Sequence, residues 1–391
     1  MRETCKPMAA DFDLEKRKHL DLLLGLLVVH IAFQFATFPG PGGEIYAASF
    51  FQLSYAFMAL IILLFMRRYF NHSLRNEIIC TVLTGAVAYV VYAEFPFAVM
   101  KGMDAADRRN DAIAAAHPAT LVTGYWSMLS KHSEDDYRGW IANFLRIRAP
   151  TVIFSAPNAV EQFRRDRAAL GLGNLTRVVA KDIDQFHTHK AFAGHFRDHF
   201  ARLDPERGLH KTPRLYAVWA EKLELLEVAR RRRFFGPTTA FFWIDIGIFR
   251  NQGPDYHLAT SGRWPDADTV AAIVASGRVA MTSVSPFTEE ELQRTSDVDA
   301  RFLDAMSYHV CACAFGGSLA ALRKARTAYY ALTQTFIDRD IFAGKDQSIW
   351  NMMHVRDRNL LELVSPTGCP GDKWFAMVPY LAGACVANSS L

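Results

Sequence analysis

Three long apolar segments in the first hundred residues constrain this chain more than any other feature. Leu22–Phe38 carries no ionisable side chain except His30, and as a helix it would span about 26 Å at roughly 1.5 Å per residue. Ala47–Met66 has no charged residue and is followed by Arg67 and Arg68, whose long side chains reach the lipid headgroups. We therefore predict an integral membrane protein.

The third apolar segment, Ile78–Met100, decides how many times the chain crosses the bilayer. It is uncharged as far as Ala93, and then Glu94 and Pro96 interrupt it. A carboxylate at mid-bilayer costs about 3 kcal/mol, and less near the interface. Three crossings would deliver residues 101–391 to the lumenal or outer side, whereas two would leave them in the cytoplasm.

Basic residues set the predicted orientation. Lys6, Lys16, Arg17 and Lys18 precede the first span. The loop Phe38–Tyr46 has no Lys or Arg, so the positive-inside rule places the N-terminus in the cytoplasm. With three spans the C-terminal domain is lumenal, in the Golgi or endoplasmic reticulum of a eukaryotic cell. A signal peptide is the alternative for the first segment, but no small-residue cleavage site follows it.

These segments divide the chain into four predicted parts. We expect a cytoplasmic tail at 1–21, a membrane region at 22–100 with helices at 22–38, 47–66 and 78–100, a linker at 101–117, and a soluble domain at 118–391. The net charge of +4 is spread over the N-terminus, one loop and short Arg runs. No basic stripe is interleaved with aromatic residues, which argues against nucleic-acid binding.

The soluble domain alternates between strand-like and helical patterns. Strands are predicted at Thr120–Trp126, Thr151–Ser155, Arg177–Ala180 and Ala240–Ile248, and helices at Asp135–Arg146, Ala159–Leu170 and Leu215–Arg233. A polar stretch through Pro213 carries no predicted element. The alternation predicts an α/β fold whose sheet contains parallel strands and is covered by helices on both faces. No Gly-rich dinucleotide or P-loop motif accompanies the strands.

Three short segments could carry chemistry. Asp245 ends an apolar strand, where parallel sheets hold ligands and metal ions; the alternative is a carboxylate that caps the next turn. Gly316 and Gly317 are adjacent and precede a helical stretch that runs through Ala325, so they either expose backbone N–H groups or form a simple turn. Asp346 lies near the start of the helical Ile349–Met353, and its alternative role is an N-cap.

Other polar residues have competing interpretations. Lys222, in the helix before the Asp245 strand, is either functional or a solvated helix position. Asp182 and Asp184 follow the third strand and are either functional acids or turn formers. Trp374 is either a ligand contact or, with Phe375, part of a lid over the core.

The cysteines and histidines do not predict a metal site. Cys311, Cys313, Cys369 and Cys385 allow two disulfides, but buried free thiols are the favoured interpretation because no CxxC or Cys/His metal spacing is present. His195 and His199 would share a face if their segment were helical, yet no catalytic Glu follows His195.

Six segments together resemble one known family. They are LVTGYW at 121–126, FLRIRAPTVIFS at 144–155, LYAVWAEKLELL at 215–226, WIDIGIFR at 243–250, AFGGS at 314–318 and GKDQS at 344–348. The family is HtrL/YibB, which includes the WlaTC-type proteins of bacterial surface-glycan loci. The resemblance covers nearly all of residues 118–391 and does not extend to the three predicted spans.

The resemblance implies a glycosyltransferase-A-like mixed sheet of the nucleotide-diphospho-sugar transferase superfamily. In that superfamily an Asp-x-Asp motif holds Mn²⁺ or Mg²⁺ against the donor diphosphate. Asp245 matches the first acid, whereas Gly247 replaces the second, so a metal at Asp245 is one expectation. The other is a donor site that uses the positive charge of Arg250, Lys222 or Lys345 instead.

The resemblance also assigns expected roles. The residues expected to bind the donor are Asp245, Gly247, Arg250 and Lys222. Those expected to bind the acceptor are Gly316, Gly317, Gln347 and Trp374. Asp346 would be the catalytic acid that contacts the acceptor, and Asp245 would be a second catalytic residue. The expected function is a membrane-anchored hexosyltransferase that moves a sugar from a nucleotide-sugar donor to a glycan or glycolipid acceptor. The alternative is an inactive relative that binds glycans or acts as a scaffold at the lipid bilayer.

Overall fold

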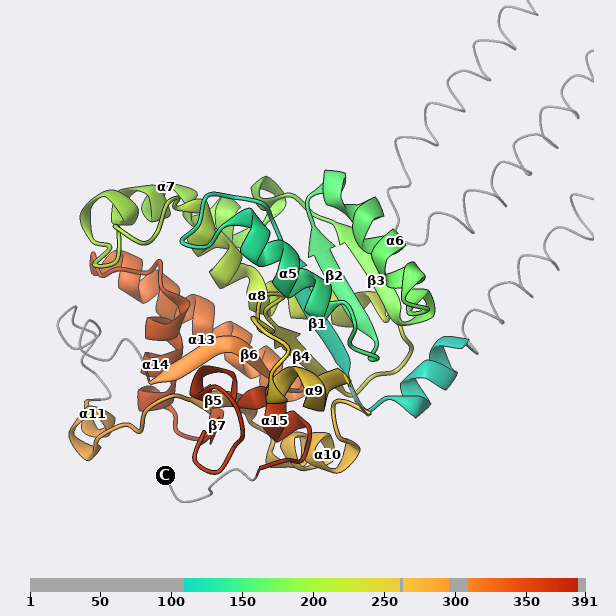
Figure 1. Ribbon diagram of the computed structural model, residues 1–391. Helices are drawn as coiled ribbons and strands as arrows, with labels where there is room; N and C mark the ends of the chain where they lie inside the picture. Colours follow the sequence, from blue (N-terminus) through green and yellow to red (C-terminus); the bar gives the residue numbers. More distant parts are fainter. Residues whose placement is uncertain (1–108, 261–262, 295–308, 386–391) are drawn as a thin grey trace, which may run out of the picture. The chain divides into compact units, whose positions relative to one another are not determined.

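The computed structural model describes residues 109–260, 263–294 and 309–385 (Figure 1). Arg108–Leu391 forms one compact unit, and its first described residues, 109–116, are helical. No helix within the described ranges is long and apolar enough to cross a membrane. The predicted tail and the three predicted spans lie outside those ranges.

A seven-stranded mixed sheet forms the centre of this unit (Figure 1). Its strands are β1 (Thr120–Tyr125), β2 (Thr151–Ser155), β3 (Thr176–Ala180), β4 (Ala240–Ile244), β5 (Val279–Ser283), β6 (Val310–Ser318) and β7 (Leu361–Val364). The order is β3-β2-β1-β4-β6-β5-β7. Strand β6 is antiparallel to both of its neighbours, and every other neighbouring pair is parallel. The predicted α/β fold is confirmed.

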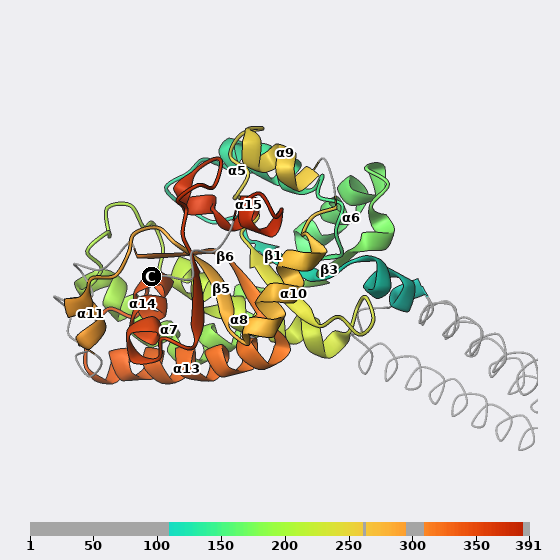
Figure 2. The ribbon, with the colours of Figure 1, turned by 90° about the horizontal axis from the view of Figure 1, so that it is seen from below.

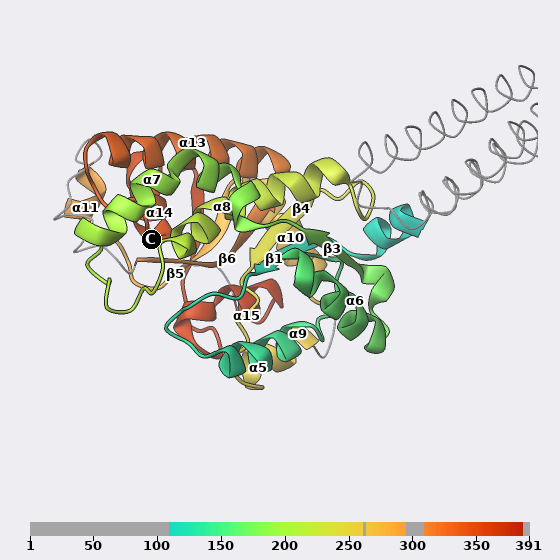
Figure 3. The same ribbon diagram turned by 90° about the horizontal axis from the view of Figure 1, so that it is seen from above.

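Helices cover both faces of the sheet (Figures 2 and 3). One face carries α5 (Glu134–Phe144), α6 (Val160–Ala169), α9 (Pro254–Thr260), α10 (Ala267–Ser276) and α15 (Met377–Leu381). The other carries α7 (His187–Arg202), α8 (Arg214–Arg232), α13 (Leu319–Asp338) and α14 (Asp346–Arg356). Helix α11 (Glu289–Gln293) contacts α14. Short 3-10 turns lie at Pro157–Ala159, Gly173–Leu175, Ile183–Gln185 and Lys373–Phe375.

The sequence of β4 shows why this sheet needs two helical layers. All five residues of Ala240–Ile244 are buried. Phe241 and Trp243 pack into the core beneath α8 and α13, whereas Phe242 and Ile244 pack into the core on the opposite face. Successive side chains of a strand point to opposite faces, so an uninterrupted apolar run is stable only when both faces are covered.

The polar stretch through Pro213 contains a helix that the sequence pattern did not predict. Helix α7 buries Phe192, Phe196 and His199, which recur at i, i+4 and i+7 and therefore share one helix face. The other positions are mostly polar, including several histidines. A narrow apolar stripe gives a weak periodic signal, and this is why the helix was missed.

The expectation that Gly316 and Gly317 open a helix from a loop is wrong. Both lie inside β6, opposite Phe242 and Phe241 of β4. A Cβ atom at Gly316 would collide with the Phe241 carbonyl oxygen, and one at Gly317 would lie 2.7 Å from the Arg278 carbonyl oxygen. Glycine is required here because the neighbouring backbones approach closely. The helix begins at Leu319.

A buried arginine supports the edge of the sheet. The Arg167 guanidinium donates hydrogen bonds to the carbonyl oxygens of Leu145, Ile147 and Ala149, at 2.9, 2.5 and 3.2 Å, and to the Thr176 hydroxyl at 2.7 Å. Burial lowers the pKa of Arg167 to about 10. These bonds hold the connection between α5 and β2 against α6.

We expect Arg167→Met to lower the free energy of unfolding by about 3–5 kcal/mol, because several buried carbonyl oxygens lose their donors at about 1–3 kcal/mol each. Urea unfolding of the purified protein, followed by circular dichroism, measures this change. Arg165→Met, at an exposed position of the same helix, is the matched control and should change stability by less than about 0.5 kcal/mol. If Arg167→Met and Arg165→Met change the free energy of unfolding equally, the buried hydrogen bonds of Arg167 do not stabilise the sheet edge as described.

Candidate functional site

A cavity of about 540 Å³ lies at the carboxyl ends of β1 and β4. Its walls carry aromatic side chains from five parts of the chain: Tyr125, Trp126, Tyr137, Trp140, Trp219, Trp243, Trp374 and Phe375. Open α/β sheets bind ligands at this edge, and the volume is within the range of small-molecule sites. The cavity is therefore the candidate functional site.

Asp245 lies directly after β4, which ends at Ile244 and not at the predicted Ile248. Its side chain is 37 % exposed and lines the cavity. Its Oδ1 accepts a hydrogen bond of 2.6 Å from Trp243 Nε1, and its backbone N–H donates to the Cys313 carbonyl oxygen at 2.7 Å. The partial burial of its carboxylate raises the pKa of Asp245, and the attraction of Lys222 offsets only part of this effect.

Lys222 connects Asp245 to a second carboxylate. Its Nζ lies 3.3 Å from Asp245 Oδ1, 3.1 Å from Asp346 Oδ2 and 2.8 Å from the Ala312 carbonyl oxygen. The side chain is 6 % exposed, so the interpretation as a solvated helix position is wrong. Burial lowers the pKa of Lys222, but the two carboxylates outweigh that effect and hold the pKa above its ordinary value.

Asp346 is buried behind Lys222 and does not line the cavity. Its side chain is 7 % exposed, and it is the first residue of α14, with Lys345 at the N-cap position. The interpretation of Asp346 as an N-cap is therefore wrong. The predicted direct contact with an acceptor is not supported by this position either, because the carboxylate accepts its hydrogen bond from Lys222.

The residues around Asp245 do not fit a divalent metal ion. Gly247 supplies no second carboxylate, and a Cβ atom there would lie 3.0 Å from the ring of Trp140. Asp245 Oδ1 and Asp346 Oδ2 already face Lys222, whereas Mn²⁺ and Mg²⁺ sites need several free oxygen ligands. The expectation of a metal held by Asp245 is not supported by this donor set.

Two cations of the cavity wall have no carboxylate partner within the described residues. Arg250 lies over the rings of Trp140 and Phe375, at 5.1 and 5.3 Å from their centroids, and is exposed to the cavity. Lys131 lines the same cavity and is also exposed. Lys345, in contrast, pairs with Glu206 at 2.9 Å. Arg250 and Lys131 are therefore the available positive charges.

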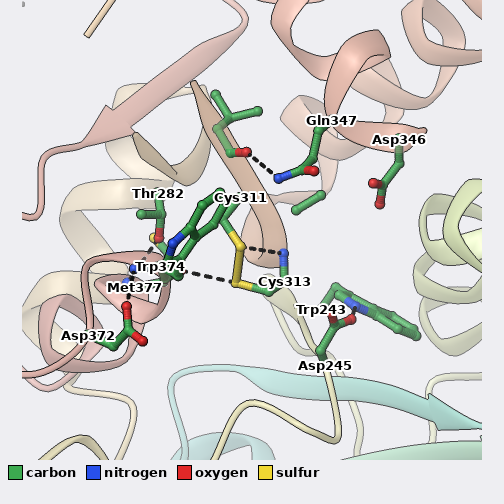
Figure 4. The surroundings of a disulfide bond; sticks show 12 residues. Trp243, Asp245, Thr282, Cys311, Cys313, Asp346, Gln347, Asp372, Trp374 and Met377 are labelled. Carbon is green, nitrogen blue, oxygen red and sulfur yellow. Dashed lines mark hydrogen bonds between the residues drawn. A yellow bond between two sulfur atoms is a disulfide. The ribbon is translucent and has the colours of Figure 1, made fainter. Parts of the chain in front are cut away.

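Gln347 and Trp374 both line the cavity. Gln347 Nε2 donates to the Val310 carbonyl oxygen at 3.0 Å. Between the two side chains lies the disulfide Cys311–Cys313 of β6, whose Cys313 Sγ is 3.2 Å from the Trp374 carbonyl oxygen (Figure 4). Gly316 and Gly317, in contrast, do not line the cavity.

The cysteines of the described residues are paired, so the favoured interpretation as free thiols is wrong. Cys311 pairs with Cys313, and Cys369 pairs with Cys385. The second disulfide connects the segment after β7 to the residues after α15. It holds this segment next to the part of the cavity wall that Trp374 and Phe375 form.

The sequence pattern missed one polar cluster of the cavity wall, formed by Asp204, Glu206 and His210. His210 Nδ1 lies 2.7 Å from Asp204 Oδ2, and Glu206 Oε2 accepts a hydrogen bond from Lys345. Glu206 and His210 both line the cavity. The residues lie in the connection between α7 and α8, where no periodic pattern or known motif marks them.

Two further groups of polar residues have structural roles. Asp182 forms a capping box with Gln185, so the interpretation as a turn former is confirmed for Asp182. Asp198, His199 and Asp340 are close enough for a metal ion. Arg202 already donates hydrogen bonds to both of these carboxylates, which leaves the group no need for a metal cation.

The chain matches none of the protein-family models with which it was compared. No curated protein matches it at a significant level either.

We expect Lys222→Met to lower the free energy of unfolding by about 3–5 kcal/mol, because it leaves the buried Asp346 carboxylate without a cation. Chemical denaturation measures the change. Lys190→Met, at an exposed position of α7, is the control and should have little effect. The double variant Lys222→Met/Asp346→Leu should recover much of the loss, since it removes both charges together. A double variant as unstable as Lys222→Met would argue against the ion pair.

Proposed function

We propose that this protein is a membrane-anchored glycosyltransferase that moves a sugar from a nucleotide-sugar donor to a glycan or glycolipid acceptor. The observation that carries the proposal is the large cavity at the carboxyl ends of β1 and β4, with Asp245 at its base and aromatic rings around it. Aromatic faces stack on nucleobases and sugars, and a carboxylate accepts hydrogen bonds from sugar hydroxyl groups. The motif order of the HtrL/YibB resemblance supports the same function.

The fold supports this proposal. A mixed seven-stranded sheet with helices on both faces is consistent with a glycosyltransferase-A-like arrangement. In that arrangement the donor lies over the carboxyl ends of the parallel strands. Asp245 and Gly247 follow β4 at this edge and both line the cavity.

The charges suggest how the donor diphosphate is held. Arg250 and Lys131 carry positive charge into the cavity without a carboxylate partner among the described residues. Arginine binds phosphate oxygens through two parallel hydrogen bonds, and lysine adds a mobile positive charge. Since the groups around Asp245 do not suit a metal, we assign the neutralisation of the leaving diphosphate to these two side chains. Lys222 and Asp346 position Asp245.

The disulfides support a lumenal position for the soluble domain. Disulfides persist in oxidising compartments and are rare in the cytosol. Cys369–Cys385 and Cys311–Cys313 therefore suit the lumen of the Golgi or endoplasmic reticulum. The same side of the membrane follows from the basic N-terminus together with three spans.

A second function, glycan binding without catalysis, is favoured by two observations. Asp346 is buried against Lys222, and Gly247 occupies the place of a second acid. An inactive relative would keep the aromatic cavity and bind a glycan or hold a partner enzyme at the membrane. The two functions differ in whether the protein binds a nucleotide-sugar donor.

The test is donor binding and hydrolysis by the full-length protein in detergent, against a panel of nucleotide sugars, with EDTA or with Mn²⁺. We expect one donor to bind and to be hydrolysed in EDTA. Arg250→Gln should weaken donor binding about tenfold or more, because a charge-assisted hydrogen bond contributes about 1.5–3 kcal/mol. Asp245→Asn should reduce turnover.

Arg197→Gln, at an exposed position of α7, is the matched control for Arg250→Gln and should leave donor binding unchanged. If the folded protein binds glycans but no nucleotide sugar, the scaffold function replaces the transferase. If hydrolysis requires Mn²⁺, the assignment of the diphosphate to Arg250 and Lys131 is wrong.

A further inference from the structure

His210 is held in the geometry of a catalytic histidine. It lies between α7 and α8, lines the cavity and is 8 % exposed. Its Nδ1 lies 2.7 Å from Oδ2 of Asp204, whose side chain is fully buried. A carboxylate on Nδ1 fixes the proton on that nitrogen and leaves the lone pair on Nε2.

Asp204 is itself fixed as a hydrogen-bond acceptor. Its Oδ1 accepts from the backbone N–H of Glu206 at 2.8 Å, and its Oδ2 accepts from the Tyr216 hydroxyl group. Within the described residues, the Asp204 carboxylate forms no ion pair with a lysine or arginine side chain, and its ionic partner is His210. Its charge is therefore directed toward the histidine, and it stabilises any imidazolium that forms there.

The other side of the imidazole is available for chemistry. Nε2 makes no hydrogen bond among the described residues, and Glu206 Oε2 lies 3.6 Å from it, within ion-pair distance of the imidazolium that forms when Nε2 takes a proton. Tyr216 and Trp219 pack edge-to-face against the ring, at 5.7 and 5.2 Å between centroids. The ring orientation is thus set by Asp204 and by two aromatic neighbours, while Nε2 keeps its lone pair.

The same cavity wall connects His210 to the Asp245 region. Glu206 Oε2 accepts a hydrogen bond from Lys345 at 2.9 Å. The next residue, Asp346, pairs with Lys222, which in turn lies 3.3 Å from Asp245. Lys345 and Asp346 are neighbours along the chain, so the start of α14 joins the ion pair beside His210 to the ion pairs beside Asp245, next to one cavity.

We propose that His210 is the general base that activates the acceptor hydroxyl group, an inference that rests on the proposed glycosyltransferase function. His210 Nε2 takes the hydroxyl proton, and the oxygen's electron pair forms the new bond to the anomeric carbon. The bond from that carbon to the diphosphate oxygen breaks, and its electron pair leaves with the nucleoside diphosphate. The imidazolium is stabilised by Asp204 and Glu206.

Asp346 does not suit this role. Its carboxylate is buried and accepts a hydrogen bond from Lys222, and it does not line the cavity. A base has to come within hydrogen-bonding reach of the proton that it removes. Of Asp346 and His210, only His210 lines the cavity and can present the lone pair of its Nε2 to a substrate.

The test uses the full-length protein in detergent, with water as the acceptor and the donor that it binds. His210→Gln should lower kcat for donor hydrolysis by about 10²–10⁴-fold. The Kd of the donor should stay within a factor of about three of the wild-type value. The acidic limb of the kcat pH profile should be lost. Asp204→Asn should also lower kcat, because it no longer fixes the Nδ1–H form. Imidazole in the buffer should restore part of the activity of His210→Ala, which a merely structural histidine would not allow.

His195→Gln, at an exposed position of α7, is the matched control and should retain wild-type kcat and donor Kd. If His210→Gln keeps kcat and the acidic limb while the wild type binds and hydrolyses the donor, the base assignment is wrong and the transferase function stands. If the folded wild type binds no donor, or binds one and never hydrolyses it, both proposals fail together.

Labelling with diethyl pyrocarbonate provides a readout that does not depend on turnover. The reagent modifies an accessible neutral imidazole nitrogen, so mass spectrometry of the wild type should find a modified His210, and bound donor should reduce the modification. If the reagent modifies His195 but leaves His210 unmodified, then His210 Nε2 is not accessible from the cavity, which would contradict the proposal.

Discussion

The shared cation Lys222 is the interaction on which the site depends. Its ammonium group, almost fully buried, contacts a carboxylate after β4, a carboxylate at the start of α14 and a carbonyl oxygen of β6. A buried charge is stable only when its partners compensate the lost hydration. These contacts therefore fix α8, β4, β6 and α14 relative to one another, and they set the position of Asp245 at the base of the cavity.

This arrangement distributes charge in a way that differs from a metal-based donor site. Positive charge near the expected diphosphate comes from side chains that are part of the fold, with Arg250 held between the rings of Trp140 and Phe375. Charge that is fixed before the ligand arrives needs little reorganisation during the reaction. On the same wall, Asp204 Oδ2 contacts His210 Nδ1, and in the proposed reaction His210 takes the proton, so charge neutralisation and proton transfer are assigned to separate groups.

Part of the fold could be predicted from the sequence because the relevant signals are local. The apolar runs of β1, β2 and β4 and the periodic pattern of α8 give their type and approximate bounds. Helix α7 was missed because polar residues surround its narrow apolar stripe. The sequence pattern does not predict strands β5, β6 and β7. For Gly316 and Gly317 it allows exposed backbone N–H groups or a turn, but not a strand, because glycine inside a strand follows from the close approach of β4 and β5.

The sequence by itself determined that a carboxylate, Asp245, follows an apolar strand, since a strand and the residue after it are neighbours along the chain. It also marked the three apolar segments by their length and lack of charge. Only the tertiary structure decided which groups meet Asp245. Lys222 and Asp346 are 124 residues apart, and His210 reaches the cavity from a loop without a motif. Such contacts depend on how helices pack on the sheet, and no local pattern encodes that packing.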